Sequence, residues 1–321
     1  MNVGFVGLGN LGRHLAARVL AGGFPLTVHD REPAALAALA HAGASTAASP
    51  RAVAEASDCV ITCLPSSAAV SAVVSGPGGI AEGLRRGGTW VDMSTNDAHE
   101  LERLAALLAE RGIATLECPV TGGVHKAAAG EITIIAGGDE AVFAAHRELL
   151  EAIGGRVIHV GPLGKASVIK VITNMLAFIH LVAAGEALML AKRGGIPLAT
   201  AYEVIRASSG NSFVHETESQ MILNGSRDIS FSMDLVMKDI GLFQRIAEAG
   251  HVPLEISPVM IEIFRDGQRR YGERANSDDI IRRLEEATGL SILAPGFPAE
   301  MVDDEPEEPG YEVVPPGRTK P

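Results

Sequence analysis

A lysine and an asparagine four residues apart, Lys170 and Asn174, occupy a long apolar stretch that predicts a helix. Residues four apart share one helix face, about 6 Å from each other. Apolar neighbours would desolvate the amine and lower its pKa towards neutral pH, where a lysine can act as a general acid or base. Taken alone, this pattern also fits a lysine that extends along an apolar surface to reach water.

A glycine-rich segment lies between a predicted strand at 3–7 and a predicted helix at 11–21. It has the spacing G-x-G-x-x-G and consists of Gly7, Leu8, Gly9, Asn10, Leu11 and Gly12. Gly7 permits a tight turn, Gly9 lets a pyrophosphate approach the backbone, and Gly12 lets the helix pack on the strand. A helix N-terminus offers N–H groups and a positive dipole end to an anion. The segment therefore predicts a dinucleotide site, with a structural glycine turn as the alternative.

An acidic residue, Asp30, follows the second predicted strand and stands 30 − 12 = 18 residues after Gly12. A carboxylate there accepts hydrogen bonds from the adenosine ribose diol and repels a 2′-phosphate, which favours NAD over NADP. The guanidinium of Arg31 could pair with such a phosphate, so NADP stays possible.

Three further segments follow predicted strands, at the edge where α/β sheets bind ligands. They are Leu64 and Pro65, Ser94 and Thr95, and the run Thr121, Gly122 and Gly123. The hydroxyls of Ser94 and Thr95 could contact a nicotinamide or cap a helix. The run from Thr121 could present N–H groups to a carboxylate or form an ordinary turn.

Two patterns divide the chain. Before Gly161-Pro162, short apolar runs alternate with helical segments, which indicates βαβ units and a mostly parallel sheet. From Lys165 to about residue 263 nearly every segment is helical, and the first helix, 165–193, is long enough to connect two domains. After residue 294 the chain turns acidic and proline-rich, which predicts an extended or disordered tail.

Composition excludes several classes of protein. The 321 residues are 47% hydrophobic, which excludes general disorder, and carry a net charge of −12, which disfavours nucleic acid and anionic membranes as partners. Lys170, Asn174, His180 and Glu186 interrupt the apolar stretch 168–190, so we expect a buried helix rather than a membrane span. Three cysteines, and no basic segment before the first apolar run, predict a cytoplasmic protein without disulfides or a signal peptide. His215 and His251 lack ligand spacing, so no metal site is predicted.

Five motifs in this order and spacing resemble the β-hydroxyacid dehydrogenase family, which includes 3-hydroxyisobutyrate dehydrogenases and tartronate semialdehyde reductases. They are Gly7–Gly12, Asp92–Thr95, Pro119–Gly123, Gly161–Asn174 and Val236–Asp239, and the resemblance covers about residues 1–288. It implies an NAD(P)-binding Rossmann domain over 1–162 and an all-helical domain for substrate and oligomerisation over 163–293, ahead of the tail at 294–321.

The resemblance also implies roles. The lysine matching Lys170 is the family's catalytic acid/base, and the position of Asn174 helps to bind substrate. The substrate carboxylate lies at the loop matching Thr121, Gly122 and Gly123, with Ser94 as a further candidate. Cofactor contacts fall at Leu64, Pro65, Thr95, Phe231 and Lys238.

We therefore expect NAD(P)-dependent oxidation of a small 3-hydroxy acid by a homodimer or homotetramer. The alternatives are an NADPH-dependent reductase of a small aldehyde acid, such as succinic or tartronate semialdehyde, an imine reductase, which generally lacks the lysine, and a non-catalytic nucleotide sensor. Departures from the family pattern leave the substrate open: Thr173 stands before Asn174, Glu117-Cys118-Pro119 replaces the commoner Asp-Ala-Pro, and His125 and Lys126 replace small residues.

Overall fold

The computed structural model describes residues 1–303 and 311–312, and these form two compact units. Unit 1 comprises Met1–Lys170 and the described residues 311–312, and unit 2 comprises the described residues from Val171 to 303. The sequence predicted the division at residue 162, where the helical pattern begins. The structure divides within the helix that follows, so Lys170 belongs to unit 1 and Asn174 to unit 2.

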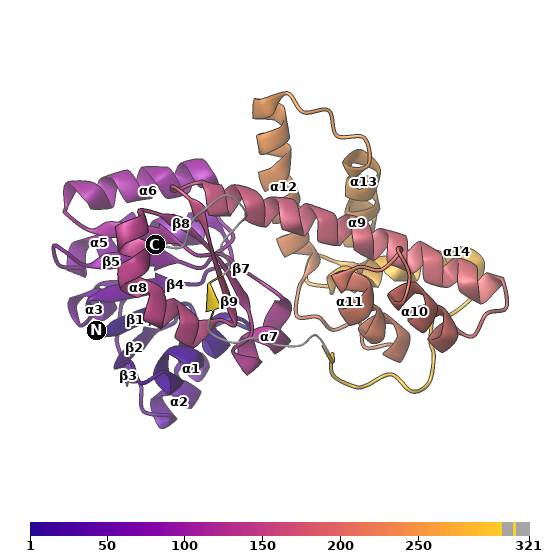
Figure 1. Ribbon diagram of the computed structural model, residues 1–321, viewed down its shortest axis with the longest axis horizontal. Helices are drawn as coiled ribbons and strands as arrows, with labels where there is room; N and C mark the ends of the chain where they lie inside the picture. The colour runs from indigo at the N-terminus through magenta and orange to yellow at the C-terminus, as the bar shows by residue number, and fades with distance from the viewer. Residues whose placement is uncertain (304–310, 313–321) are drawn as a thin grey trace. The chain divides into compact units, whose positions relative to one another are not determined.

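Unit 1 is built on a twisted sheet (Figure 1). The strands run in the order β10-β9-β8-β6-β5-β4-β1-β2-β3, with β7 beside β8. Their bounds are β1 Val3–Val6, β2 Leu26–His29, β3 Ser45–Thr46, β4 Cys59–Thr62, β5 Thr89–Asp92, β6 Ala114–Glu117, β7 Val120–Thr121, β8 Thr133–Gly138, β9 Arg156–Gly161 and β10 Tyr311–Glu312. Strands β1 to β6 pair in parallel, and β8 pairs antiparallel with β6. The predicted α/β fold with a mostly parallel sheet is confirmed.

Helices cover both faces of this sheet, which explains why every residue of the central strands β1, β4 and β5 is buried. Phe5 and Ile61 pack into one buried cluster, whereas their neighbours Val6 and Val60 pack into another with Trp90. The helices of unit 1 are α1 Gly12–Ala21, α2 Pro33–His41, α3 Pro50–Glu55, α4 Ser67–Ser75, α5 Ile80–Gly83, α6 Ala98–Glu110, α7 Gly123–Ala129 and α8 Glu140–Ile153.

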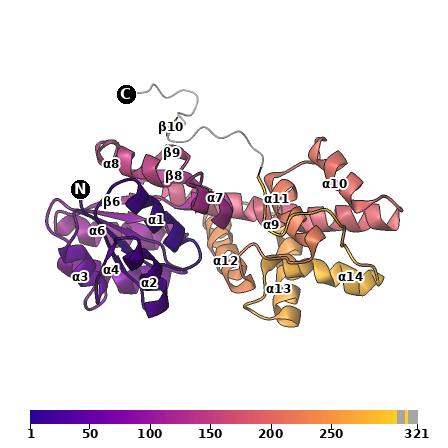
Figure 2. The same ribbon diagram turned by 90° about the horizontal axis from the view of Figure 1, so that it is seen from below.

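Unit 2 is all helical, as predicted, and α9 is its longest element (Figure 2). The helices are α9 Lys165–Arg193, whose first turns belong to unit 1, then α10 Leu198–Arg206, α11 Phe213–Asn224, α12 Met233–Gly250, α13 Ser257–Tyr271, the 3-10 helix η1 Ser277–Ile281 and α14 Arg282–Thr288. Close packing explains Gly185 in the middle of α9, because a Cβ there would lie 2.2 Å from Cδ1 of Ile281. Helix α9 has the length and hydropathy of a membrane span, but Phe178, Leu181 and Leu188 form part of the core of unit 2. We read it as a core helix.

The predicted tail begins as a segment bound to unit 2. Gln220 on α11 donates to the carbonyl of Val302 at 2.7 Å and accepts from its N–H at 3.1 Å. Phe297 packs edge-on against Tyr202 at 5.1 Å. Residues 311–312 are extended as β10 and pair in parallel with β9. The rest of the predicted tail, 304–310 and 313–321, lies outside the described residues.

Candidate active site

The glycine-rich loop lies at the point where the strand order of the sheet reverses. Strand β1 has β2 on one side and β4 on the other, and both pairs are parallel. The loop Gly7–Gly12 follows β1, and Leu64 and Pro65 follow β4. Parallel α/β sheets bind ligands outside the carboxyl ends of their strands at such a switch point. The fold therefore brings these two predicted cofactor segments together.

The three glycines of this loop have distinct steric surroundings. Gly7 has φ of +100°, and a Cβ there would lie 2.3 Å from the carbonyl oxygen of Cys63. A Cβ at Gly12 would lie 2.0 Å from the carbonyl oxygen of Gly7. Gly9 has open space, with nothing within 4 Å of the corresponding position. Two glycines are thus needed to fold the loop, while the third leaves its surface bare, as a pyrophosphate requires.

The carboxylate of Asp30 organises the same loop from the end of β2. One oxygen accepts the N–H of Leu8 at 2.6 Å, and the other accepts the N–H of Glu32 at 2.9 Å. Carboxylate oxygens can each accept more than one hydrogen bond, so these contacts leave capacity for a ribose diol. The residues present therefore fit the adenosine half of a dinucleotide.

Three hydrogen bonds join the loops after β4 and β5. The N–H of Leu64 donates to Oγ of Ser94 at 2.9 Å, and the N–H of Asp97 donates to Oγ of Ser67 at 3.1 Å. Beneath them, Oγ1 of Thr62 donates to Asp92 at 2.9 Å. The hydroxyl of Ser94 is therefore engaged in holding Leu64. These bonds fix the segments predicted to face the nicotinamide half of a cofactor.

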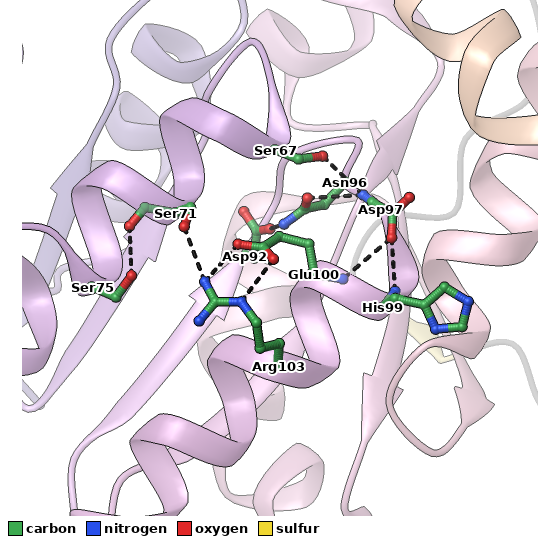
Figure 3. Close-up of polar contacts among 9 residues, drawn as sticks. All are labelled: Ser67, Ser71, Ser75, Asp92, Asn96, Asp97, His99, Glu100 and Arg103. Atoms are coloured by element: carbon green, nitrogen blue, oxygen red, sulfur yellow. Dashed lines mark hydrogen bonds and ion pairs between the residues drawn. The ribbon is translucent and has the colours of Figure 1, made fainter. Parts of the chain in front are cut away.

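Asp92 is the central acceptor of this polar network, and Figure 3 shows it beside Asn96. It is 1% exposed, and burial raises the pKa of its carboxyl while the surrounding donors act to lower it. It accepts from the N–H of Ser94 at 3.1 Å and from Nδ2 of Asn96 at 2.9 Å. Asp97 then accepts the N–H groups of His99 and Glu100 and so caps the N-terminus of α6.

The predicted carboxylate loop follows β7 and opens α7. Thr121 pairs with Thr133 of β8, and the next two residues, Gly122 and Gly123, have φ of +123° and +89°. Side chains other than glycine rarely adopt such angles, so the backbone requires both glycines. The aliphatic chain of Lys126 and the ring of His125 lie close to these glycines. The loop is a tight turn flanked by two basic side chains.

Lys170 is 8% exposed and lies in the second turn of α9, inside unit 1. The first turn of this helix is held by Glu117 at the end of β6, which accepts the N–H groups of Ala166 at 3.0 Å and Ser167 at 2.9 Å. The lysine is thus joined through a short stretch of helix to the carboxyl edge of the sheet.

In unit 2, a buried aspartate joins two of the predicted site residues. Asp239 is 1% exposed and accepts from Nδ2 of Asn174 at 2.6 Å. Its other oxygen lies 2.9 Å from Nζ of Lys238. Phe231, the third predicted residue of unit 2, stacks on Phe178 of α9 with ring centroids 6.2 Å apart.

Comparisons with known proteins agree with this arrangement. Residues 2–161 match the NAD binding domain of 6-phosphogluconate dehydrogenase, and residues 164–284 match the NAD-binding domain of NADP-dependent 3-hydroxyisobutyrate dehydrogenase. The chain is 34% identical to the 2-(hydroxymethyl)glutarate dehydrogenase of Eubacterium barkeri, over 91% of this chain and 97% of that protein. The chain belongs to the β-hydroxyacid dehydrogenase family.

Solved structures of similar proteins lead to the same family. The 3-hydroxyisobutyrate dehydrogenase of Salmonella typhimurium is 32% identical, with a TM-score of 0.81 over 88% of this chain and 99% of that chain. The protein Psf3, solved in complex with NADP+ and 2-OPP, is 28% identical, with a TM-score of 0.82 over 88% and 99% of the two chains. This β-hydroxyacid dehydrogenase is thus an NAD(P)-dependent enzyme, as the sequence predicted.

Sequence reasoning missed several residues of this dehydrogenase that the geometry makes important. Thr62, Asn96 and Asp239 were not candidates, and Glu117 was noted only as a departure from the family pattern. Asp92 and Asp239 lie inside the family motifs Asp92–Thr95 and Val236–Asp239, and this was the sequence signal that could have pointed to them. Their contacts join residues 30 and 65 positions apart, which one sequence does not reveal. The residue roles implied by the resemblance stay predictions.

Proposed function

We propose that this enzyme oxidises a 3-hydroxy acid with NAD as the preferred cofactor and with Lys170 as the general base. The observation that carries the proposal is the buried lysine, fixed one helical turn beyond the Glu117 contact on the sheet that bears the dinucleotide loop. A buried amine is suited to exchange a proton near neutral pH.

The chain's own residues would bind the substrate and move one proton. Bound NAD would supply the acceptor for the hydride that leaves the carbinol carbon. As that carbon–oxygen bond becomes a carbonyl, Nζ of Lys170 takes the hydroxyl proton and later releases it to water. In the reverse direction the ammonium of Lys170 protonates the carbonyl oxygen. Thr121, Gly122, Gly123 and Asn174 would hold the carboxylate, so that orientation contributes much of the rate.

Ser94 would act differently from the other predicted substrate residues. Its Oγ already accepts the N–H of Leu64, and its N–H donates to Asp92. These contacts support a role in holding the cofactor loop, in addition to the substrate contact that the sequence predicted for Ser94. For Lys238, which lies beside Asp239, and Phe231, which stacks on Phe178, we keep the cofactor role that the family resemblance implies.

The names of the relatives suggest the chemical class of the substrate. In both 2-(hydroxymethyl)glutarate and 3-hydroxyisobutyrate, a CH2OH group is attached to a carbon that also bears a carboxylate. We propose the same 3-hydroxy acid unit for this chain. Reduction of a small aldehyde acid with NADPH is the second candidate, because the exposed Arg31 follows Asp30 directly and could pair with a 2′-phosphate.

A panel assay of reduced-nicotinamide absorbance tests the proposal. Purified enzyme would be given NAD or NADP with 3-hydroxyisobutyrate, 3-hydroxypropionate, 2-(hydroxymethyl)glutarate, threonate, glycerate or serine. We expect turnover of at least one 3-hydroxy acid, faster with NAD. Tight dinucleotide binding without turnover in either direction, with semialdehydes included, would leave the nucleotide sensor as the better account.

We also propose a cytoplasmic homodimer or homotetramer. Exposed apolar side chains on helices of unit 2, among them Leu176, Leu190 and Val204, support self-association. The free thiols of Cys59, Cys63 and Cys118 fit a reducing compartment. Light scattering of the purified protein gives the assembly state, and a monomer at assay concentration would contradict it.

A further inference from the structure

We propose that Glu117 is a positioning residue that sets the place and the proton affinity of Lys170 by capping α9 from the sheet. This inference rests on the proposed role of Lys170. No role was predicted for Glu117 from the sequence. Variants of both residues are compared below, so that the positioning role of Glu117 and the acid/base role of Lys170 can be contradicted separately.

The Glu117 carboxylate takes the place of an N-terminal cap on α9. One oxygen accepts the N–H of Ala166 at 3.0 Å, and the other accepts both the N–H of Ser167 at 2.9 Å and its hydroxyl at 2.5 Å. The first N–H groups of a helix have no partners within the helix, so they need an outside acceptor. Here the acceptor comes from a strand 49 or 50 residues earlier in the chain.

The neighbouring strand is shaped to admit this side chain. Gly137 on β8 is the in-register partner of Glu117, and a Cβ at Gly137 would lie 2.5 Å from Oε1 of Glu117. Glu117 itself is 1% exposed. The carboxylate is therefore confined between β8 and the first turn of α9, and that turn cannot shift without breaking its hydrogen bonds.

The same carboxylate acts electrostatically on the helix that bears the lysine. Burial raises the pKa of Glu117, while the donors on Ser167 and Ala166 act to lower it. The N–H groups of Ala166 and Ser167 both donate to this carboxyl, and such donors favour its ionised form. A negative charge at a helix N-terminus offsets the positive end of the dipole, and that end would otherwise favour a neutral amine on Lys170.

Glu117 therefore has two consequences for the proposed base. Because Lys170 lies three residues after Ser167, displacement of the first turn moves Nζ relative to the cofactor loops. A misplacement of about 1 Å can reduce a rate by roughly 100-fold. Loss of the negative charge also favours the neutral amine, so oxidation should reach half its maximal rate at a lower pH.

The test compares Glu117→Gln, Glu117→Asp and Gly137→Ala with the exposed control Glu110→Gln at the end of α6. For Glu117→Gln we expect kcat to fall by about 10–100-fold with unchanged dinucleotide Kd. The half-maximal pH of kcat/KM should fall by about 0.5–1 unit. Other ionisable groups near this carboxylate include Asp92 on β5 and Cys118 after β6, and these variants leave both of them unchanged.

The conservative variants separate charge from position. Glu117→Asp keeps the charge, so the pH profile should match the wild type while kcat falls less than in Glu117→Gln. Gly137→Ala keeps the carboxylate but crowds it, so kcat should fall without loss of the ionisable group. Melting temperatures identify any variant that fails to fold, and Glu110→Gln should behave as the wild type.

Lys170→Ala, measured alongside, distinguishes the two ideas. If Lys170→Ala is inactive but Glu117→Gln has the wild-type kcat and pH profile, Glu117 does not position the base. If Lys170→Ala keeps the wild-type rate, the proposed function fails whatever Glu117 does. A fall in kcat with an unshifted pH profile in Glu117→Gln would also overturn the electrostatic part of the proposal.

Discussion

Asp92 and Glu117 are in-register partners on the adjacent strands β5 and β6, and both carboxylates are buried. In-register residues of parallel strands point to the same face of the sheet. Asp92 holds the loop that carries Ser94, and Glu117 holds the first turn of the helix that carries Lys170. One row of the sheet thus positions both a predicted cofactor loop and the proposed base.

Replacement of Asp92 by Asn should destabilise unit 1 and loosen this loop. An amide at this position turns one acceptor oxygen into a donor facing Asn96 or Ser94. A buried donor left without an acceptor reduces the free energy of unfolding by about 1–3 kcal/mol. Denaturant unfolding measures this loss, with Glu110→Gln as the matched surface control. An unchanged midpoint in Asp92→Asn would contradict the assigned network.

The glycines of the first loop predict two opposite outcomes. Gly9→Ala adds a methyl group where nothing lies within 4 Å, so the protein should fold normally but bind NAD at least about tenfold more weakly. Gly12→Ala places its methyl group 2.0 Å from the carbonyl oxygen of Gly7, and should destabilise the fold by about 1–3 kcal/mol. Calorimetric titration and thermal melting measure the two effects. Wild-type affinity in Gly9→Ala would exclude a pyrophosphate over this glycine.

The residues Asp30 and Arg31 should set the choice of dinucleotide. Asp30→Asn removes the charge that repels a 2′-phosphate, so the ratio of kcat/KM for NADP to that for NAD should rise by about tenfold. Arg31→Ala should lower the same ratio. The two ratios are compared with one substrate and at one ionic strength. A ratio that stays constant in both variants would mean that neither side chain reads the ribose.

A carboxyl pair in unit 2 should make stability depend on pH. Glu218 on α11 and Asp278 on η1 hydrogen-bond to each other, and burial raises the pKa of Glu218 to about 7 and that of Asp278 well above its usual range. The folded state then binds more protons than the unfolded state, whose carboxyl groups titrate near about pH 4. The stabilisation that this pair adds to the free energy of unfolding is therefore fully present below about pH 4 and is lost as the pH rises through about 7.

Glu218→Gln weakens this dependence because the amide does not titrate and only Asp278 remains ionisable. As the pH rises from 5 to 8, we expect the melting temperature of the variant to increase relative to that of the wild type by about 3 °C or more. Glu203→Gln, an exposed change on α10, is the control and should follow the wild type at every pH. Parallel curves for wild type and Glu218→Gln would show that the pair does not share a proton.

Local patterns predicted much of this fold. Apolar runs bounded by glycine gave the first strands, and the bounds of α9 match the predicted helix 165–193. The antiparallel pairing of β8 with β6 was not predicted from the sequence. Strand direction depends on long-range pairing, and a run such as Ile134–Ala136 is equally apolar in either orientation.

The candidate site was predictable where the backbone itself constrains residue type. Gly7, Gly12, Gly122 and Gly123 are such positions, because a Cβ or a negative φ would not fit there. Buried polar contacts were not predictable in this way. Glu117 was visible only as a departure from the family pattern, and its contact with Ser167 joins residues 50 positions apart. The division of the two units inside α9 has no counterpart in the sequence pattern, since the helical pattern continues across it.

The rate of Lys170→Ala tests the central claim most directly, with Lys165→Ala as its control. Lys165 begins the same helix but is exposed. With saturating NAD and a 3-hydroxy acid substrate, we predict that Lys170→Ala lowers kcat by about 10²–10⁴ while the Kd for reduced nicotinamide dinucleotide is unchanged. Lys165→Ala should keep the wild-type rate. A wild-type kcat in Lys170→Ala, in protein that binds the dinucleotide normally, would contradict the account.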